Sequence, residues 1–306
     1  MKKKVAVLMG GFSVEREVSL SSAQGVLKAL EELGHVAVPI DVCRDMGKLI
    51  KSLEVHKPDV VLNILHGRWG EDGCIQGLLE MMGISYSHSG VLGSALSMNK
   101  VVARMICEIN GLRLPEGQVA KLVDVCAGQV MKPPYVIKPI GEGSSVGVHI
   151  IFDEKTPLPS PEEWPFEDDV LVERYIPGRE VQVAVIGGKA YGAIEIRPKG
   201  TFYDYEAKYT DGKADHLMPA PIHPDAYAQV LEWAEIAHKV LECRGVSRSD
   251  FRYDDTQGEP GTLYYLETNP QPGLTPLSLV PEIVAHTGMS YTQLVQWMVE
   301  DASCRR

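Results

Sequence analysis

The sequence has no long apolar run, few aromatic residues and no excess of positive charge, and each absence excludes a class of protein. No segment of the 306 residues approaches the roughly 20 consecutive apolar residues that a membrane-spanning helix requires. Aromatic residues make up 7% of the chain while 44% is hydrophobic, which is the profile of a globular protein. Lys and Arg number 30 against 41 Asp and Glu, a net charge of −11. Such an acidic surface repels phosphate backbones and anionic lipids, so we expect neither a nucleic acid nor a membrane as partner.

Cysteine is also sparse, and its spacing shows no pairing pattern. The six cysteines include no CxxC pair, and their spacing is unlike that of zinc ligands. The lysine-rich start is followed by an apolar run, residues 5–9, that is too short for the hydrophobic region of a signal peptide. We therefore interpret this run as a buried strand, and expect reduced thiols and a cytoplasmic protein.

The first hundred residues alternate strand-like and helix-like segments. Residues 5–9 and 60–65 are continuous apolar runs, which is typical of parallel strands covered on both faces. Residues 20–33 carry leucine and alanine at helical spacing, and Gly34 would end that helix. With a strand at 36–40 and a helix at 46–53, the order predicts an open α/β unit. Such a sheet binds ligands in the loops that follow its strands.

The rest of the chain mixes helical and strand patterns. We predict one helix over residues 92–110 and another over 227–241. Short strands are predicted at 135–138, 148–152, 170–173, 249–253 and 263–267, with a hairpin at 181–186 and 191–196. Residues 197–216 have no sustained period, and a loop this long in a compact domain is usually functional or disordered.

Gly141 to Gly147 form a glycine- and serine-rich turn between two predicted strands. Such a turn directs several backbone N–H groups at one point and makes an anion-binding nest. Lys138, a single cation in a buried strand, favours an anionic ligand there, because burying an unpaired lysine is costly. The turn has no Walker A ending and leads to a strand, so a P-loop does not fit. A flexible hairpin is the alternative.

Two carboxylates and an amide are predicted to converge near the end of the chain. Glu267 and Asn269 are two residues apart at a strand end and therefore share a face, and Asp250 comes from a neighbouring strand. These hard oxygen donors suit Mg²⁺ that also bridges phosphates. Arg248 would share the face of Asp250, so a salt-bridged sheet is the alternative.

The aperiodic segment holds a tyrosine-rich stretch, residues 203–209, with Lys208 near its end. A mobile loop with a lysine among tyrosines suits a lid over a charged ligand. A surface loop that packs its own tyrosines is equally compatible with the composition.

Eight segments resemble, in order, the motifs of the D-alanine–D-alanine ligases, a family of the ATP-grasp superfamily. The first reads Gly10-Gly11-x-Ser13-x-Glu15 and the second His66-Gly67-x-x-Gly70-Glu71-Asp72-Gly73. The others are residues 94–100, 138–147, 202–209, 248–250, 267–269 and 272–281. His88 stands where the family frequently has glycine. A single motif of this length can arise by chance, but eight in the correct order are strong evidence of the resemblance.

The resemblance implies a fold and an activity. The fold would be ATP-grasp, α/β and α+β, with an N-terminal open parallel-sheet domain at 1–97, a central subdomain at 98–178 and a C-terminal metal-bearing subdomain at 179–306. ATP would phosphorylate the carboxylate of one D-alanine, and the amine of a second would displace phosphate, giving D-alanyl-D-alanine and ADP for peptidoglycan synthesis. Two Mg²⁺ or Mn²⁺ ions and a homodimer are also implied.

The resemblance further implies roles for individual residues. Asp250, Glu267 and Asn269 would hold the metal ions. The nucleotide would be bound by Lys100, Lys138, Lys208, the Gly143 to Ser145 backbone, Glu173, Ile176 and Glu180. The first D-alanine would be bound by Glu15, linked to Ser144 and Tyr209, with His66 nearby. Arg248 and the Gly273 N–H would stabilise the tetrahedral oxygen, and Ser278, the Leu279 N–H and Lys208 would bind the second carboxylate.

Two rival functions stay open at this point. One is a ligase that joins D-alanine to D-lactate or D-serine, although Tyr209 favours the dipeptide by family analogy. The other is a nucleotide- or amino-acid-binding protein without catalysis. Against the second stands the set of Arg248, Asp250, Glu267 and Asn269, because simple binding needs no paired-metal geometry.

Overall fold

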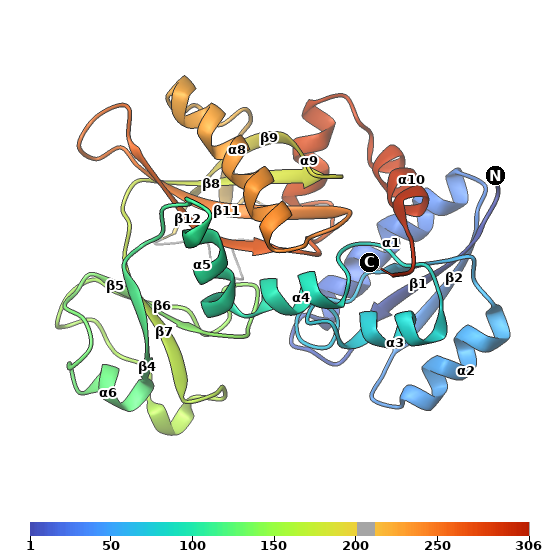
Figure 1. Cartoon of the computed structure of the whole chain (residues 1–306), viewed down its shortest axis with the longest axis horizontal. Coiled ribbons are helices and arrows are strands. Elements are labelled where there is room, and N and C mark those ends of the chain that lie inside the picture. Colours follow the sequence, from blue (N-terminus) through green and yellow to red (C-terminus); the bar gives the residue numbers. More distant parts are fainter. Residues whose placement is uncertain (201–211, 306) are drawn as a thin grey trace.

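The computed structural model describes residues 1–200 and 212–305, which form three β-sheets with helices around them. Figure 1 shows the sheet that contains the N-terminus at one end of the elongated molecule and the other two sheets at the opposite end. No helix in the described residues has the length and apolar character needed to cross a bilayer.

The first sheet is the predicted open α/β unit. Its strands have the order β2-β1-β3 and both pairings are parallel, which confirms the prediction from the continuous apolar runs. Gly34 follows the first helix at φ +75°, the left-handed conformation expected of a residue that ends a helix. Helix α3 was not predicted from the sequence. The elements are β1 (Lys4–Gly10), α1 (Arg16–Glu32), β2 (Val36–Val42), α2 (Met46–His56), β3 (Val60–Asn63) and α3 (Cys74–Met82).

The single helix predicted over residues 92–110 is wrong, because two helices occupy this region. They are α4 (Val91–Met98) and α5 (Lys100–Ile109). Asn99 lies between them in an extended conformation, and its side-chain oxygen accepts hydrogen bonds from Val101 N and Val102 N, both at 3.1 Å. Asn99 therefore ends one helix and caps the next.

The second sheet is antiparallel, with the order β4-β7-β5-β6. Its apolar side chains pack on α6 and on the segment around Trp164. The glycine- and serine-rich turn connects β5 to β6, as predicted. The elements are β4 (Gly117–Lys121), α6 (Leu122–Cys126), β5 (Tyr135–Pro139), β6 (His149–Ile151), η1 (Pro161–Glu163) and β7 (Asp169–Arg174).

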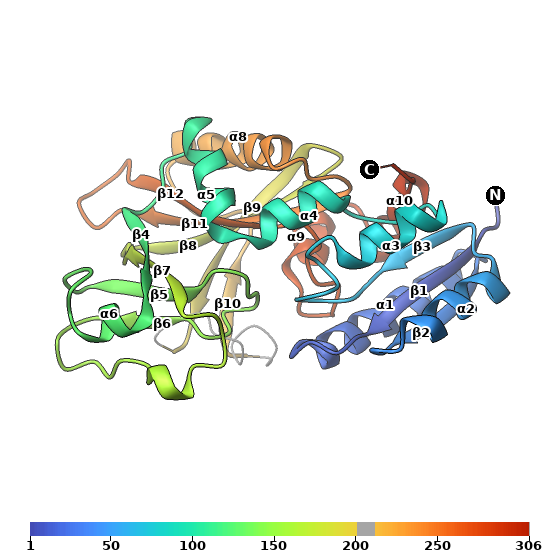
Figure 2. The same ribbon diagram turned by 60° about the horizontal axis from the view of Figure 1, so that its bottom comes forward.

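The third sheet is also antiparallel, with the order β10-β9-β8-β11-β12. Figure 2 shows α5 and α8 on one side of this sheet and the four-stranded sheet on the other. Helix α9 packs on β8 and β9, and α10 packs on α1. The elements are β8 (Arg179–Ile186), β9 (Lys189–Pro198), β10 (Ala214–Leu217), α8 (Pro224–Val240), β11 (Val246–Asp254), β12 (Thr262–Asn269), α9 (Leu279–His286) and α10 (Tyr291–Asp301).

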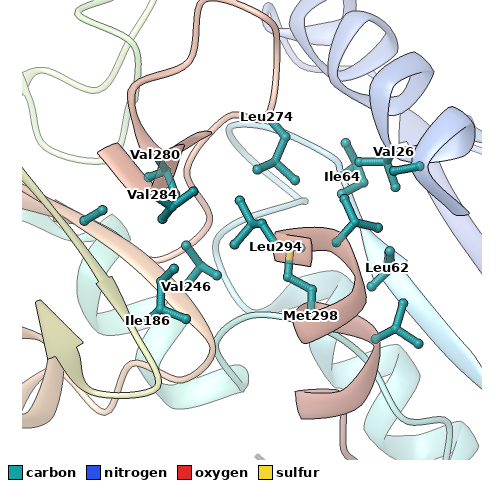
Figure 3. Packing of buried hydrophobic residues seen from close by; sticks show 14 of the residues in the cluster. Val26, Leu62, Ile64, Ile186, Val246, Leu274, Val280, Val284, Leu294 and Met298 are labelled. Carbon is teal, nitrogen blue, oxygen red and sulfur yellow. The ribbon is translucent and has the colours of Figure 1, made fainter. Parts of the chain in front are cut away.

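One apolar core joins the first sheet to the five-stranded sheet. In Figure 3, Val26 and Ile64 approach Leu294 and Met298 of α10, and Val280 of α9 lies on the far side of the cluster. Each fully buried side chain of this size contributes about 1.5–3 kcal/mol. This core therefore fixes the loops that follow β1 and β3 relative to the strands that carry the predicted metal ligands.

Candidate active site

The three oxygen donors predicted at the chain's far end lie together on β11 and β12. Asp250 is the register partner of Glu267, and Arg248 is the register partner of Asn269. Opposed residues of an antiparallel pair share one face of the sheet, so the four side chains line one surface. Arg248 donates to both carboxylate oxygens of Asp250, at 2.8 and 3.0 Å. Arg248 and the two acids thus share one face of the sheet, as the spacing predicted, and Arg248 forms a salt bridge with Asp250.

The donor set at this surface fits a hard divalent cation. Two carboxylates and an amide oxygen are the ligands that Mg²⁺ prefers, and a carboxylate that accepts from arginine still has lone pairs for a metal. Within residues 1–200 and 212–305, no group of three or more His, Cys, Asp or Glu residues is placed to hold a metal ion, and the set described here has two carboxylates and one amide.

The turn between β5 and β6 has the backbone conformation of an anion-binding loop. Ser144 and Ser145 both lie at positive φ, 49° and 59°, and Val146 N donates to Gly143 O at 3.0 Å. Lys100 connects this turn to the acids, because its Nζ donates to Glu142 O and lies 3.6 Å from Glu267 Oε2. A phosphate between the turn and the acids would meet a lysine and backbone N–H groups.

Lys138 has a protein partner that the sequence did not indicate. Its Nζ pairs with Glu173 Oε1, and Arg104 Nη1 pairs with Glu173 Oε2 at 2.6 Å. The Glu173 side chain is only 2% exposed, while those of Lys138 and Arg104 are 12% and 11% exposed. One buried carboxylate thus neutralises two cations only in part, which leaves net positive charge beside the turn.

A cavity of about 390 Å³ lies between the four-stranded and five-stranded sheets. Apolar side chains from both sheets line one part of it, among them Val136, Ile150 and Leu266. Gln182 Nε2 donates to Glu180 Oε1 at 3.1 Å and holds that carboxylate. The predicted residues that line the cavity are Lys100, Lys138, Ser145, Glu173, Ile176, Glu180, Asp250 and Glu267. Its walls thus combine an apolar slot with cations and acids.

Glu15, just before α1, connects the first sheet to the turn between β5 and β6. It is 5% exposed, and Ser144 Oγ donates to its Oε1. Gly67 is needed beside it, because a Cβ at that position would clash with Glu15 Oε2 and its φ is +71°. Ser13 Oγ donates to His66 O at 2.6 Å and ties the two loops of the first sheet together.

His66 forms a buried pair with Glu71. The His66 Nδ1 atom lies 3.0 Å from Glu71 Oε1, and Ser22 Oγ lies 3.4 Å from His66 Nε2. Burial raises the pKa of Glu71 to about 7 despite its hydrogen bond to His66. Burial alone would lower the pKa of His66, but the hydrogen bond and charge of Glu71 raise it above its ordinary value. The pair therefore retains a proton up to about pH 7.

The loop before α9 brings the remaining predicted residues into position. Ser278 Oγ accepts from Thr275 N at 2.9 Å and lies close to Gly273, where a Cβ would approach it to 2.9 Å. Leu279 is the first residue of α9, so its N–H has no partner within the helix. Lys208 and Tyr209 lie outside the described residues.

Three residues beyond the predicted set contribute to the site. Arg104 and Glu71 provide charged partners for predicted residues, and Gln182 orients Glu180. Glu71 was within reach of sequence reasoning because it is part of the second motif. Arg104 left no signal, because its partner Glu173 is 69 residues away in the sequence. Gln182 was within reach, because it is two residues from Glu180 on the same strand and shares its face.

A cavity between two antiparallel sheets, with a glycine-rich turn, lysines and paired carboxylates on its walls, defines an ATP-grasp fold. The crystal structure of a D-alanine–D-alanine ligase from Bacillus anthracis complexed with ATP aligns with a TM-score of 0.81 and 29% identity, over 98% of this chain and 97% of that chain. The VanG D-Ala:D-Ser ligase from Enterococcus faecalis aligns with a TM-score of 0.78 and 28% identity, over 98% and 99%.

Sequence comparison narrows the class. The D-alanine–D-alanine ligase of Parvibaculum lavamentivorans is 52% identical over 307 residues, 99% of each chain. That of Paramagnetospirillum magneticum is 50% identical over 307 residues, 99% of this chain and all of that one. Family models for the D-ala D-ala ligase C-terminus and N-terminus match residues 116–300 and 44–89. The chain belongs to the D-alanine–D-alanine ligase family.

Proposed function

We propose that this protein uses ATP to join two D-alanine molecules through a D-alanyl phosphate, and so supplies D-alanyl-D-alanine for peptidoglycan synthesis. The observation that carries the proposal is the contact between Glu15 and Ser144. It brings a buried carboxylate, suited to an amino acid's ammonium group, to the turn suited to phosphate. The relatives at 50% and 52% identity that are named D-alanine–D-alanine ligase support this assignment.

The nucleotide would occupy the cavity between the two antiparallel sheets. Adenine would lie against Val136 and Ile150, with backbone groups near Glu173 and Ile176, and Glu180 would accept from the ribose hydroxyls. Adenine and ribose would thus be bound by neutral and hydrogen-bonding groups. The phosphates would meet Lys100, Lys138, Gly143 and Ser145, whose positive charge and N–H groups offset their negative charge.

Asp250, Glu267 and Asn269 would hold Mg²⁺ or Mn²⁺. Bound metal ions would supply charge neutralisation of the phosphates. Lys100, 3.6 Å from Glu267, would hold the terminal phosphate beside these carboxylates. Arg248 would keep Asp250 oriented through its two hydrogen bonds.

The chemistry requires positioning more than a protein nucleophile. A carboxylate oxygen of the first D-alanine attacks the terminal phosphorus of ATP, the bond to ADP breaks, and an acyl phosphate forms. The amine of the second D-alanine then attacks the acyl carbon and loses a proton, and phosphate leaves. Glu15 would hold the first ammonium, with Ser144, Tyr209 and His66 around it.

The tetrahedral intermediate and the second amino acid would be bound at the loop before α9. Arg248 and the Gly273 N–H would stabilise the developing negative oxygen, as preorganised donors do in other acyl transfers. Ser278, the Leu279 N–H and Lys208 would bind the carboxylate of the second D-alanine. The free N–H at the start of α9 suits that anion.

We further propose a cytoplasmic homodimer organised in three structural units, residues 1–97, 98–178 and 179–306. Helices α3, α4 and α5 expose large apolar side chains, and α4 packs on both neighbours. Met81, Leu92, Met105 and Ile109 are 90%, 57%, 61% and 82% exposed. This apolar surface supports self-association.

The test is D-alanine-dependent release of ADP by the purified protein with Mg²⁺. We expect release with D-alanine and none with L-alanine, together with D-alanyl-D-alanine as the product. Adding D-lactate or D-serine as a competing second substrate separates the rival ligases, which would form the mixed product. ADP release that is independent of any amino acid would contradict the proposal.

A further inference from the structure

A second cavity, of about 280 Å³, lies in the first sheet's unit and outside the proposed nucleotide cavity. Among the residues with proposed roles, only His66 contributes to its lining. Its walls are mainly aliphatic, with Val42, Met46, Leu65, Ile75 and Leu78 from β2, α2, α3 and the loop after β3. Nothing in the proposed reaction uses this space.

Two aromatic side chains from separate loops close one side of the cavity. Phe12 follows β1, and Trp69 follows β3, and their ring centroids are 5.9 Å apart with the planes inclined at 39°. Trp69 lies at φ +74°, in the left-handed region that a bulky residue rarely adopts, and is 40% exposed. The two loops thus present an aromatic surface to a ligand.

Two guanidinium groups lie over these two aromatic rings, and Arg68 also interacts electrostatically with the Glu142 carboxyl. Arg44 lies 4.7 Å from the centre of the Phe12 ring, and Arg68 lies 5.2 Å from the centre of the Trp69 ring. Neither arginine forms an ion pair with an acid in the part of the chain that the structure describes. Among the described residues that line the cavity, none is Asp or Glu. The cavity is therefore mainly apolar inside, and two arginines lie at its rim.

We propose that this cavity binds a small apolar carboxylate, with its ring or branched chain among the aliphatic side chains and its carboxylate at Arg44 and Arg68. The volume sets the size of the ligand. A cavity of about 150 Å³ holds one benzene molecule, so about 280 Å³ admits a ligand of two fused rings. The charge of the rim selects an anion over a neutral molecule of the same shape. The proposal goes beyond the ligase activity and does not depend on it.

Isothermal titration with 2-naphthoate tests the site, and 2-naphthalenemethanol is the matched uncharged probe. Titrations are made with saturating non-hydrolysable ATP analogue, Mg²⁺ and D-alanine, so that the cavities used by the reaction are filled. We expect one naphthoate per chain and about tenfold weaker binding of the alcohol, because only the carboxylate makes charge-assisted contacts with the two exposed arginines. The proposal would be overturned if naphthoate failed to bind while the ATP analogue is present, or if it bound no more tightly than the alcohol.

Variants assign the binding to this cavity. Arg44→Gln and Arg68→Gln should each weaken naphthoate binding about fivefold, because each removes one exposed charge. Leu78→Trp should abolish binding by filling the space. The control is Arg113→Gln, an exposed arginine distant from the cavity, which should bind naphthoate as the wild type does.

The arginine variants alter exposed side chains, so the test does not depend on a variant that disturbs folding. Unchanged binding in both would contradict the assignment. Sedimentation velocity on the same variants distinguishes another occupant. If Arg44→Gln or Leu78→Trp altered the oligomeric state, the cavity would be covered by a second copy of the chain and the proposal would be wrong.

Discussion

Replacement of Arg104 by leucine should destabilise the protein and weaken ATP use together. Arg104 donates to Glu173 Oε2 at 2.6 Å and to Pro115 O at 2.6 Å, and its side chain is 11% exposed. In Arg104→Leu, the buried Glu173 keeps only Lys138 as a partner. Removing one partner of a buried ion pair costs about 3–5 kcal/mol. Because Lys138 remains, we expect a loss near the lower limit, about 3 kcal/mol.

The same substitution should alter the nucleotide cavity. With Arg104 gone, Glu173 attracts Lys138 alone, so the lysine charge is less available to phosphate. The KM for ATP should rise about tenfold, the scale of one charge-assisted hydrogen bond. Urea unfolding and the ADP-release assay measure the two effects on one preparation.

A double-mutant cycle with Glu173→Gln tests whether the cost arises from the unpaired carboxylate. If it does, Arg104→Leu combined with Glu173→Gln should be more stable than the sum of the two single losses predicts, by about 1–2 kcal/mol. A single variant within 1 kcal/mol of wild type, or strictly additive losses, would refute the reasoning.

Three further predictions concern the acids of the site. Glu15→Gln should lower kcat/KM for D-alanine about a hundredfold by removing the ammonium's counter-charge, while the exposed Glu17→Gln should leave it unchanged; equal phosphate release by both variants would contradict this role. Glu267→Ala should lose activity at least about a thousandfold, and recovery with excess Mg²⁺ would show that Glu267 is a minor ligand. In the folded protein Glu71 has a pKa of about 7 and in the unfolded chain about 4.5, so wild type should lose stability relative to Glu71→Gln as pH rises from 4.5 to 7, by up to about 3 kcal/mol. Thermal melts of both proteins across this range measure the difference, and parallel profiles would contradict the buried pair with His66.

The spacing of apolar residues predicted the fold correctly where a single strand or helix accounts for a single apolar pattern. The continuous apolar runs of β1 and β3 identified a parallel sheet because strands covered on both faces have no polar side. The boundary at Asn99 was missed for a physical reason. Apolar residues continue at helical spacing on both sides of it, and the break depends on local hydrogen bonds that the asparagine side-chain oxygen accepts from Val101 N and Val102 N.

In the site, local spacing was informative and distant pairing was not. The shared face of Glu267 and Asn269 followed from the strand pattern, since side chains two apart on a strand share a face. Asp250 was expected from a neighbouring strand, and it is the register partner of Glu267. The partners of Glu173 did not follow, because Lys138 and Arg104 are 35 and 69 residues away from it in the sequence. His88, where the family frequently has glycine, lies at φ +65°, so the position has the backbone conformation that favours glycine.

The two walls of the nucleotide cavity are attached to the molecule by different forces. The five-stranded sheet shares a continuous apolar core with the first sheet, whereas the apolar cluster of the four-stranded sheet consists, in the described residues, of that sheet, helix α6 and the adjoining loops. The four-stranded sheet and its turn contact neighbouring elements through polar groups, namely Glu173 with Arg104, Glu142 with Lys100, and Ser144 with Glu15. Polar contacts of this kind exchange readily with water or ligand, whereas apolar burial does not. A nucleotide that contacts both sheets would therefore strengthen the attachment of the four-stranded sheet to the rest of the protein. The affinity of the cavity for phosphate and the position of the four-stranded sheet would then depend on the same few charged side chains.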